Sequence, residues 1–203
     1  MEKEEIENQE KLWDKIATEW HEYKQKPSKN AVYFLSQTKG NVLDLGAGSG
    51  RHLTKIKNGK MFLQDFSSEM LRLAKEKSLS QNIPAEFIQS PLDKIPKEDN
   101  FFDYAICVSA LHCVETEKER KNSVKELYRT LKQKGEAYIG VWNRNSKRFK
   151  GKKEEKLVGW GEIGKRYYYL YTEEEVHELF KSTGFKIVST HNSEMMINFV
   201  VQK

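Results

Sequence analysis

Two absences narrow the class of this protein: it has few cysteines, and it has no long apolar run. Cys107 and Cys113 form no C-x-x-C pair and have no histidine at the spacing of a metal ligand. We therefore expect both to pack in the interior, and we expect no metal site. No segment approaches the ~18 apolar residues of a membrane-spanning helix, and the first residues lack the apolar region of a signal peptide. These features predict a cytoplasmic protein with no membrane partner.

The chain also shows no internal repeat, no low-complexity segment and no sign of a second domain. Its 203 residues suit one domain with a sizeable core, so residues 1–203 are predicted to form a single domain. Residues 1–38 are predicted to be an N-terminal helical cap on that domain. The apolar residues that fall largely on one face of this helix are Ile6, Trp13, Ile16, Ala17, Trp20 and Tyr23.

Positive charge is concentrated in one segment. Nine basic and three acidic residues lie between Asn143 and Arg166, whereas the rest of the chain is close to neutral. Residues 143–171 are therefore interpreted as a basic and aromatic insertion on the substrate side. Binding to a polyanion requires such a segment, but a solvated lysine-rich loop has the same composition.

The order of the predicted elements indicates an α/β fold. Short apolar runs predict strands, helical periodicity predicts the segments between them, and the two kinds alternate. This alternation predicts a doubly wound parallel sheet. Strands are expected at 41–45, 61–64, 86–89, 103–108 and 136–142, and helices near 51–57, 67–78, 118–132 and 172–182.

Two further β-rich runs, 185–191 and 195–201, follow the last helix. Only Asn192, Ser193 and Glu194 separate them, which permits a hairpin but no parallel crossover. One of the two strands must then run against the others. We expect a seven-stranded, mostly parallel sheet with one antiparallel strand near its edge.

The most informative motif is the segment VLDLGAGSG at 42–50. It is an apolar strand followed by a turn whose glycines let a ligand approach the main chain. A dinucleotide-binding turn needs G-x-G-x-x-G, whose third glycine would fall on Arg51. The pattern D-x-G-x-G-x-G instead resembles the first motif of class I S-adenosylmethionine-dependent methyltransferases. This resemblance implies S-adenosylmethionine as cofactor, held by Asp44, Gly46, Ala47, Gly48 and Gly50.

The end of the second strand supplies a further candidate ligand. Asp65 comes 21 residues after Asp44, and a carboxylate is suited to accept hydrogen bonds from two ribose hydroxyls. Phe66 is then expected against one face of the adenine. Asp65 could instead cap the next helix, although Ser67 is the better cap candidate.

The third strand ends in a departure from the family pattern. Class I methyltransferases often place an acid and a small residue here, whereas this chain has Ser90, Pro91 and Leu92, with Asp93 slightly late. Depending on the register, the adenine contact falls on Ser90 or Pro91, or on backbone amides and Leu92.

The fourth strand and its exit, FDYAICVSALHC at 102–113, are similar to the "FD-apolar-strand-LHH" segment of the same superfamily. The resemblance implies that the backbone at Cys107 and Val108 passes the methionine end of the cofactor. It also implies that His112 faces the surroundings of the transferred methyl group as a catalytic candidate. A purely structural role for this histidine stays open.

Two segments resemble a narrower family, the tRNA methyltransferases that esterify carboxymethyl-uridine at the wobble position. LVGW at 157–160 with RYYYLYT at 166–172 is similar to that family's "VPW…RYYH-apolar-F" segment, and residues 13–27 are similar to its "YDEIA…TRxxPW" segment. The resemblance implies a tRNA substrate and a small zinc-binding activator protein as partner. It makes Lys24 a catalytic candidate, and the implied substrate contacts are Arg144, Lys147, Arg148, Trp160, Arg166 and Tyr167.

The chain departs from this narrower family at four positions. Lys24 replaces an arginine, Ser28 a tryptophan, Gly159 a proline and Cys113 a second histidine. Lysine offers a point charge where arginine offers a planar fork, so the substrate geometry could differ.

The implied chemistry asks the protein mainly for positioning. Methyl transfer is an in-line displacement in a site shielded from water. A carboxylate is already ionised at neutral pH and needs no general base, which agrees with the lack of an obvious acid/base pair in the sequence. Two alternatives stay open: a small-molecule methyltransferase of the quinone-biosynthesis type, and a catalytically silent partner subunit.

Overall fold

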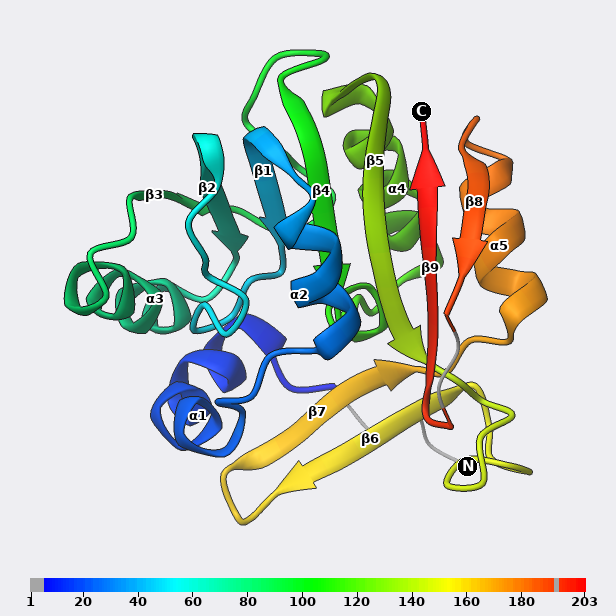
Figure 1. The fold of residues 1–203 in the computed structure, drawn as a ribbon. Helices are drawn as coiled ribbons and strands as arrows, with labels where there is room; N and C mark the ends of the chain where they lie inside the picture. Colours follow the sequence, from blue (N-terminus) through cyan, green and yellow to red (C-terminus); the bar gives the residue numbers. More distant parts are fainter. Residues whose placement is uncertain (1–5, 192–193) are drawn as a thin grey trace.

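The protein folds around one seven-stranded sheet (Figure 1). The structure is a computed structural model that describes residues 6–191 and 194–203. The strand order is β3-β2-β1-β4-β5-β9-β8, and β9 is antiparallel to both of its neighbours whereas the other pairings are parallel. The predicted sheet with one antiparallel strand near its edge is confirmed. The strands are β1 (Lys39–Leu45), β2 (Lys57–Asp65), β3 (Ala85–Gln89), β4 (Phe102–Val108), β5 (Leu131–Trp142), β6 (Glu155–Trp160), β7 (Gly164–Tyr169), β8 (Lys186–Thr190) and β9 (Met196–Gln202).

Helices cover both faces of the sheet. Ala74 of α3 shares a core with Val42, and Leu127 of α4 shares another with Leu43. Because consecutive strand residues point to opposite faces, the apolar run of β1 is buried on both sides. No helix of the described residues is long and apolar enough to span a bilayer. The helices are α1 (Gln9–Tyr23), α2 (Lys29–Ser36), α3 (Ser68–Ser80), α4 (Glu117–Thr130) and α5 (Glu173–Lys181), with a short 3₁₀ turn at Leu111–Cys113.

Three of the helices begin at caps that the sequence encodes. Thr116 and Thr172 each form a capping box with a glutamate three residues later, Glu119 and Glu175. The side chain of Ser67 caps α3. These caps fix where α3, α4 and α5 start after the ends of the neighbouring strands.

A second layer lies over the carboxyl ends of the parallel strands, at the bottom of Figure 1. It consists of α1 and the antiparallel hairpin of β6 and β7. Trp13 and Ile16 of α1 pack with Met70 of α3 and Trp160 of β6 in an apolar cluster of their own. This layer therefore covers the point between β1 and β4 where the strand order reverses, which is where ligands of such sheets bind.

Three elements differ from the prediction. Residues 51–57, predicted as a helix, form turns, and β2 already begins at Lys57. Only six residues separate Gly50 from β2, less than two turns of helix, and Leu53 and Ile56 enter the core from irregular backbone. α2 lies within the helical cap predicted for residues 1–38 but was not predicted as a separate helix, and the β6–β7 hairpin is absent from the prediction. α2 buries only Ala31 and Leu35, too few for a periodic signal.

Candidate active site

The turn after β1 brings bare main chain to a cavity. Gly46 has φ +76°, and a Cβ on it would lie 2.2 Å from the Cβ of Ala110, so only glycine lets these two strand ends approach. Gly48 has φ +53°, and its added Cβ would meet nothing nearer than the Met70 sulfur at 3.9 Å. The space beside Gly48 is therefore open to a ligand.

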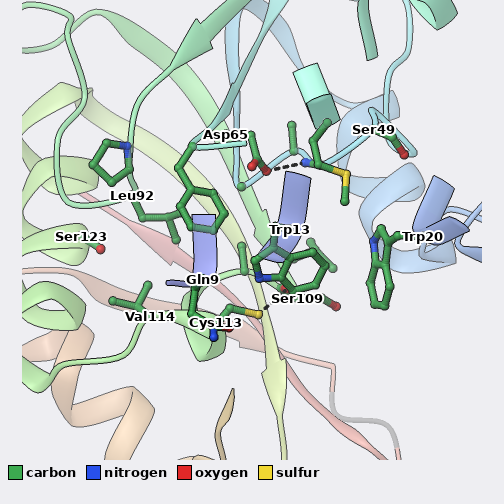
Figure 2. Close-up of a pocket in the computed structure, with 18 of the residues that line it drawn as sticks. Gln9, Trp13, Trp20, Ser49, Asp65, Leu92, Ser109, Cys113, Val114 and Ser123 are labelled. Atoms are coloured by element: carbon green, nitrogen blue, oxygen red, sulfur yellow. Dashed lines mark hydrogen bonds between the residues drawn. The ribbon is translucent and has the colours of Figure 1, made fainter. Parts of the chain in front are cut away.

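Asp65 holds this turn in place. Its Oδ2 accepts a hydrogen bond from the N–H of Gly48 at 2.8 Å (Figure 2). Its Oδ1 accepts one from the N–H of Ser67 at 3.0 Å. Burial raises the pKa of Asp65 to about 6, against the lowering effect of these backbone hydrogen bonds. A carboxylate oxygen has two acceptor sites, so both oxygens retain capacity for a ligand's hydroxyls.

A first pocket lies between this turn and α1. Figure 2 shows Asp65 and Ser49 on one side of it, with Gln9, Trp13 and Cys113 on the other. Cys113, expected from the sequence to pack in the interior, faces this pocket. The first pocket is lined by residues 46–49, 65–66, 91–93, 108–110 and 113–115 and by side chains of α1, among others.

Most of the predicted cofactor ligands line the first pocket, and four do not. Gly50 packs instead, since its added Cβ would lie 3.2 Å from the Cβ of Ala74. Ser90 donates its hydroxyl to the carbonyl of Lys94 at 2.7 Å, and Asp93 lines the pocket in its place. Asp44 and Cys107 are buried behind the pocket wall. The predicted ligands that do line it are Gly46, Ala47, Gly48, Asp65, Phe66, Leu92 and Val108.

Asp44 supports the turn from behind. Its Oδ2 lies 3.9 Å from Nδ1 of His52 and has no hydrogen-bond partner among the described residues. Burial raises the pKa of Asp44 to about 7 and lowers that of His52 to about 3. Nε2 of His52 accepts a hydrogen bond from the N–H of Ser28 at 3.3 Å. This buried pair thus links the glycine turn to the segment before α2.

A second pocket adjoins the first. The residues that line both are Trp20, Lys24, Arg51, Val108 and Ser109. Beyond this junction, the walls of the second pocket come from residues 28–30, from the aromatic side chains of Tyr23, Trp142 and Trp160, and from Arg148, Arg166 and Met195–Met196, among others.

The second pocket is strongly positive. Five basic side chains line it, and no acidic one does among the described residues. Burial, together with the charges of Arg51, Arg148 and Arg166, lowers the pKa of Lys24. The cations of this pocket therefore lie close enough to repel one another, and a bound anion would reduce that repulsion. The basic side chains are Lys24, Lys29, Arg51, Arg148 and Arg166.

Arg166 sits in an aromatic cage. Its guanidinium carbon lies 4.8 Å from the ring centre of Trp160 and 5.0 Å from that of Trp20. It donates to the hydroxyl of Tyr168 at 2.9 Å, whereas its buried Nε has no partner among the described residues. Stacking on aromatic faces fixes the plane of an arginine, so Arg166 forms a rigid wall of the second pocket.

His112, the predicted catalytic histidine, does not line either pocket. Its ring is buried and stacked on Trp142 with 5.1 Å between ring centres. Nδ1 accepts a hydrogen bond from the N–H of Trp142 at 3.1 Å, and burial lowers its pKa to about 3. This placement fits a residue that orders the end of β5, not one that touches a substrate.

The predicted substrate residues divide into two groups. Arg148, Trp160 and Arg166 line the second pocket, as does Lys24, the other catalytic candidate. Three others line neither pocket: Arg144 pairs with two glutamates, Lys147 lies 3.6 Å from Glu194 on the surface, and the hydroxyl of Tyr167 donates to Glu155.

Several residues that the fold brings to the pockets were not predicted from the sequence, above all Arg51 and Trp20. Arg51 follows the glycine turn, in the segment predicted as a helix, and Trp20 was assigned only to an apolar helix face. Asp14 lines neither pocket, but it was not predicted either: its Oδ1 accepts from the Ser67 hydroxyl at 2.6 Å and the Glu69 N–H at 3.1 Å, which ties α1 to α3. The only signal for these residues was their position next to recognised motifs.

The fold and the first pocket are typical of enzymes that bind a nucleoside-type cofactor. In such enzymes a doubly wound sheet carries a glycine turn and a carboxylate at the switch point of the strand order. A family profile described as "Methyltransferase domain" matches residues 42–135. Among curated proteins, the tRNA (carboxymethyluridine(34)-5-O)-methyltransferase of Schizosaccharomyces pombe is 27% identical over 87% of this chain and 88% of its own length. The ubiquinone/menaquinone biosynthesis C-methyltransferase UbiE of Rickettsia prowazekii is 32% identical, over 47% of this chain and 41% of its own.

Solved structures share the fold. A complex of the Haloferax volcanii Trm112 methyltransferase activator with a methyltransferase superposes with a TM-score of 0.75 at 19% identity, over 96% of this chain and 97% of that one. The Burkholderia thailandensis 1,6-didemethyltoxoflavin-N1-methyltransferase, solved with S-adenosylhomocysteine, superposes with a TM-score of 0.68 at 15% identity. The match covers 99% of this chain and 92% of that one. The chain has the fold of the class I methyltransferases. It is an S-adenosylmethionine-dependent methyltransferase, and S-adenosylmethionine is its cofactor.

Proposed function

We propose that this enzyme methylates the carboxylate of a carboxymethyl-uridine at the wobble position of tRNA. The observation that carries the proposal is the second pocket: five cations and several aromatic rings, with no acid among the described residues that line it, directly beside the cofactor pocket. A carboxylate on a planar base matches both features, since cations bind the acid and aromatic faces stack on the base. The Schizosaccharomyces pombe relative carries this activity in its name.

The residues of the chain suit this reaction. Bound S-adenosylmethionine supplies a methyl group on a sulfonium, which bonds to the acceptor oxygen as the carbon–sulfur bond breaks and its electron pair stays on sulfur. Asp65 and the turn at 46–48 would hold the cofactor, and the ring of Trp20, which lines both pockets, would limit the access of water to their junction. No proton has to be removed from a carboxylate at neutral pH, so the burial of His112 away from the pockets does not impair the chemistry.

The test is methylation of a defined tRNA. Purified enzyme with S-adenosylmethionine is incubated with tRNA that carries carboxymethyl-uridine, and the nucleosides are analysed by mass spectrometry. We expect the methyl ester, which mild alkali should hydrolyse back to the acid. Transcripts with unmodified uridine serve as control. Methylation of those transcripts, or none of the modified tRNA, would contradict the proposal.

A small-molecule methyltransferase of the quinone type is the second candidate, favoured by the partial match to UbiE. Carbon methylation of a ring requires a group that accepts the displaced proton. The second pocket offers cations instead, and His112, with its lowered pKa, is buried outside it. A quinol assayed in parallel with the tRNA separates the two candidates.

We also propose that a small zinc-binding activator covers the edge of the sheet at β3. Among the described residues, β3 has only one neighbouring strand, β2, and unpaired edges are natural pairing sites. Leu79 is 73% exposed at the end of α3, and Ile83 and Phe87 are only partly buried. Co-expression with a Trm112-type protein, followed by size exclusion, should give a stable pair. Leu79→Lys with Phe87→Lys should separate it, whereas substitution of Lys186 on the opposite edge strand should not.

A further inference from the structure

We infer that Arg51 selects the acceptor: its guanidinium binds the substrate's carboxylate at the junction of the two pockets and aligns it for methyl transfer. This inference rests on the proposed function, which it deepens by assigning the specificity for an acid to one residue. The in-line geometry of the reaction requires the attacking oxygen to lie where the cofactor pocket opens into the substrate pocket. Of the five basic side chains in the second pocket, only Lys24 and Arg51 also line the first.

Arg51 is the more firmly placed of these two. One of its terminal nitrogens, Nη2, donates to the carbonyl of Val108 at 3.3 Å and to the hydroxyl of Ser109 at 3.2 Å. Ser109 is itself fixed, in the left-handed region at φ +63°, with its N–H bonded to the carbonyl of Gly140. Lys24 instead ends α1 on a flexible stem over the ring of Tyr23, 5.7 Å from its centre. A guanidinium has five N–H donors in a planar fork, and the two bonds to β4 and Ser109 engage a single nitrogen.

The electrostatics of the junction support the same assignment. Arg51 reaches the junction from the residue after the glycine turn, so it occupies the wall next to the sulfonium's pocket. With Arg148 and Arg166 it adds positive charge around Lys24. Carboxylates line the first pocket, where the cationic cofactor would bind, but none lines the second among the described residues, so a carboxylate on the acceptor is the group that would offset the cations there. A neutral acceptor of the same shape would leave the cations unpaired, which is how sites reject isosteres.

Arg51 is expected to affect substrate binding more than the rate of methyl transfer. The carboxylate's charge disappears as the ester forms, so an arginine bound to it stabilises the bound substrate at least as much as the transition state. Loss of Arg51 should therefore raise KM more than it lowers kcat. If Arg51 had only a structural role, its substitution would weaken the binding of charged and neutral acceptors equally.

The experiment compares 5-carboxymethyluridine with its neutral isostere 5-carbamoylmethyluridine, each titrated by calorimetry into enzyme saturated with S-adenosylhomocysteine. We expect the wild type to bind the acid at least ~10-fold more tightly than the amide, the range for charge-assisted hydrogen bonds. In Arg51→Gln this preference should fall to ~3-fold or less, with the affinity for the amide unchanged. Arg72→Gln, on the exposed face of α3 in pairs with Glu69 and Glu76, is the matched control and should keep the wild-type preference.

A second readout needs no acceptor. Arg51 repels the sulfonium of S-adenosylmethionine but not the neutral S-adenosylhomocysteine, so Arg51→Gln should improve the affinity for the first relative to the second, and Arg51→Lys should not. If Arg51→Gln keeps the preference for the acid, and also keeps the wild-type ratio of the affinities for S-adenosylmethionine and S-adenosylhomocysteine, the inference is overturned even where tRNA is methylated. If tRNA is not methylated but both readouts change as expected, the tRNA assignment fails and the acid-selecting role of Arg51 stands. Should Arg51→Gln not fold, Arg51→Lys alone decides: retention of charge without the fork should weaken binding of the acid several-fold and leave the amide unaffected.

Discussion

Gly46→Ala is expected to destabilise the protein by about 2–5 kcal/mol through one added methyl group. A non-glycine residue at φ +76° costs roughly 1–2 kcal/mol. The new Cβ would also lie 2.2 Å from the Cβ of Ala110, which forces the ends of β1 and β4 apart, and overpacking of this kind costs about 1–3 kcal/mol. Urea unfolding followed by circular dichroism, without cofactor, measures the reduction in stability.

Two further variants separate the two contributions. Gly48→Ala has a similar backbone cost but no atom nearer than 3.9 Å to its Cβ, so we expect a decrease of only about 1–2 kcal/mol. Ala110→Gly removes the opposing methyl, and the double variant with Gly46→Ala should recover most of the overpacking term, a coupling of about 1–3 kcal/mol in a double-mutant cycle. Equal decreases in the two glycine variants, with no coupling to Ala110, would refute the packing argument.

Three other predictions concern charge. Because the folded-state pKa of Asp44 is raised to about 7, the folded protein holds this proton more tightly than the unfolded chain, so the contribution of Asp44 to stability should fall as pH rises from about 4 to above 7. His52 and His112, with lowered pKa values, act in the opposite direction, so the test is the difference in stability between the wild type and Asp44→Asn in urea titrations. The wild type should lose stability relative to the variant between pH 5 and pH 8, and a difference that does not change with pH would contradict the assignment. Asp65→Ala should weaken S-adenosylmethionine binding ~10-fold or more in calorimetry, as expected for charge-assisted hydrogen bonds, and an unaltered affinity would show that Asp65 serves the turn alone. The last variant changes four lysines of the exposed loop at 147–153 to glutamine: Lys147, Lys150, Lys152 and Lys153. It should weaken tRNA binding and reduce the slope of its salt dependence by about 0.7–0.9 for each phosphate that the loop no longer binds, while the affinity for the cofactor stays the same. An unchanged slope would identify the loop as a solvated connector.

The parts of the site that the sequence predicted are those encoded locally. The turn at 46–48 and Asp65 follow directly from apolar strands, and in a parallel sheet the carboxyl ends of neighbouring strands necessarily meet. Gly46, Gly48 and Asp65 therefore came together as expected. Gly50 shows the limit of the same motif, because the pattern of glycines does not distinguish a residue that admits a ligand from one that admits a helix, here Ala74 of α3.

The second pocket was less predictable because it is assembled from segments that lie far apart in the sequence. Trp20 comes from α1, Arg51 from the glycine turn, and Trp160 and Arg166 from the hairpin, whose strands were not predicted. The basic composition of residues 143–171 indicated an anion, but it did not indicate which cations face inward. Arg144 shows why: it belongs to the same segment, yet pairs with Glu154 and Glu175 away from the pocket, and such pairing depends on tertiary structure.

His112 and Cys113 connect the departures of this chain to its chemistry. The narrower family has two histidines here, whereas this chain has one, and its ring is stacked on Trp142 with a lowered pKa. The thiol of Cys113 lines the first pocket, and burial raises its pKa so that it stays protonated at neutral pH. Neither group can accept a proton from a substrate there, because one is buried elsewhere and the other is already protonated. The proposed acceptor, which arrives ionised, needs a proton acceptor from neither of them.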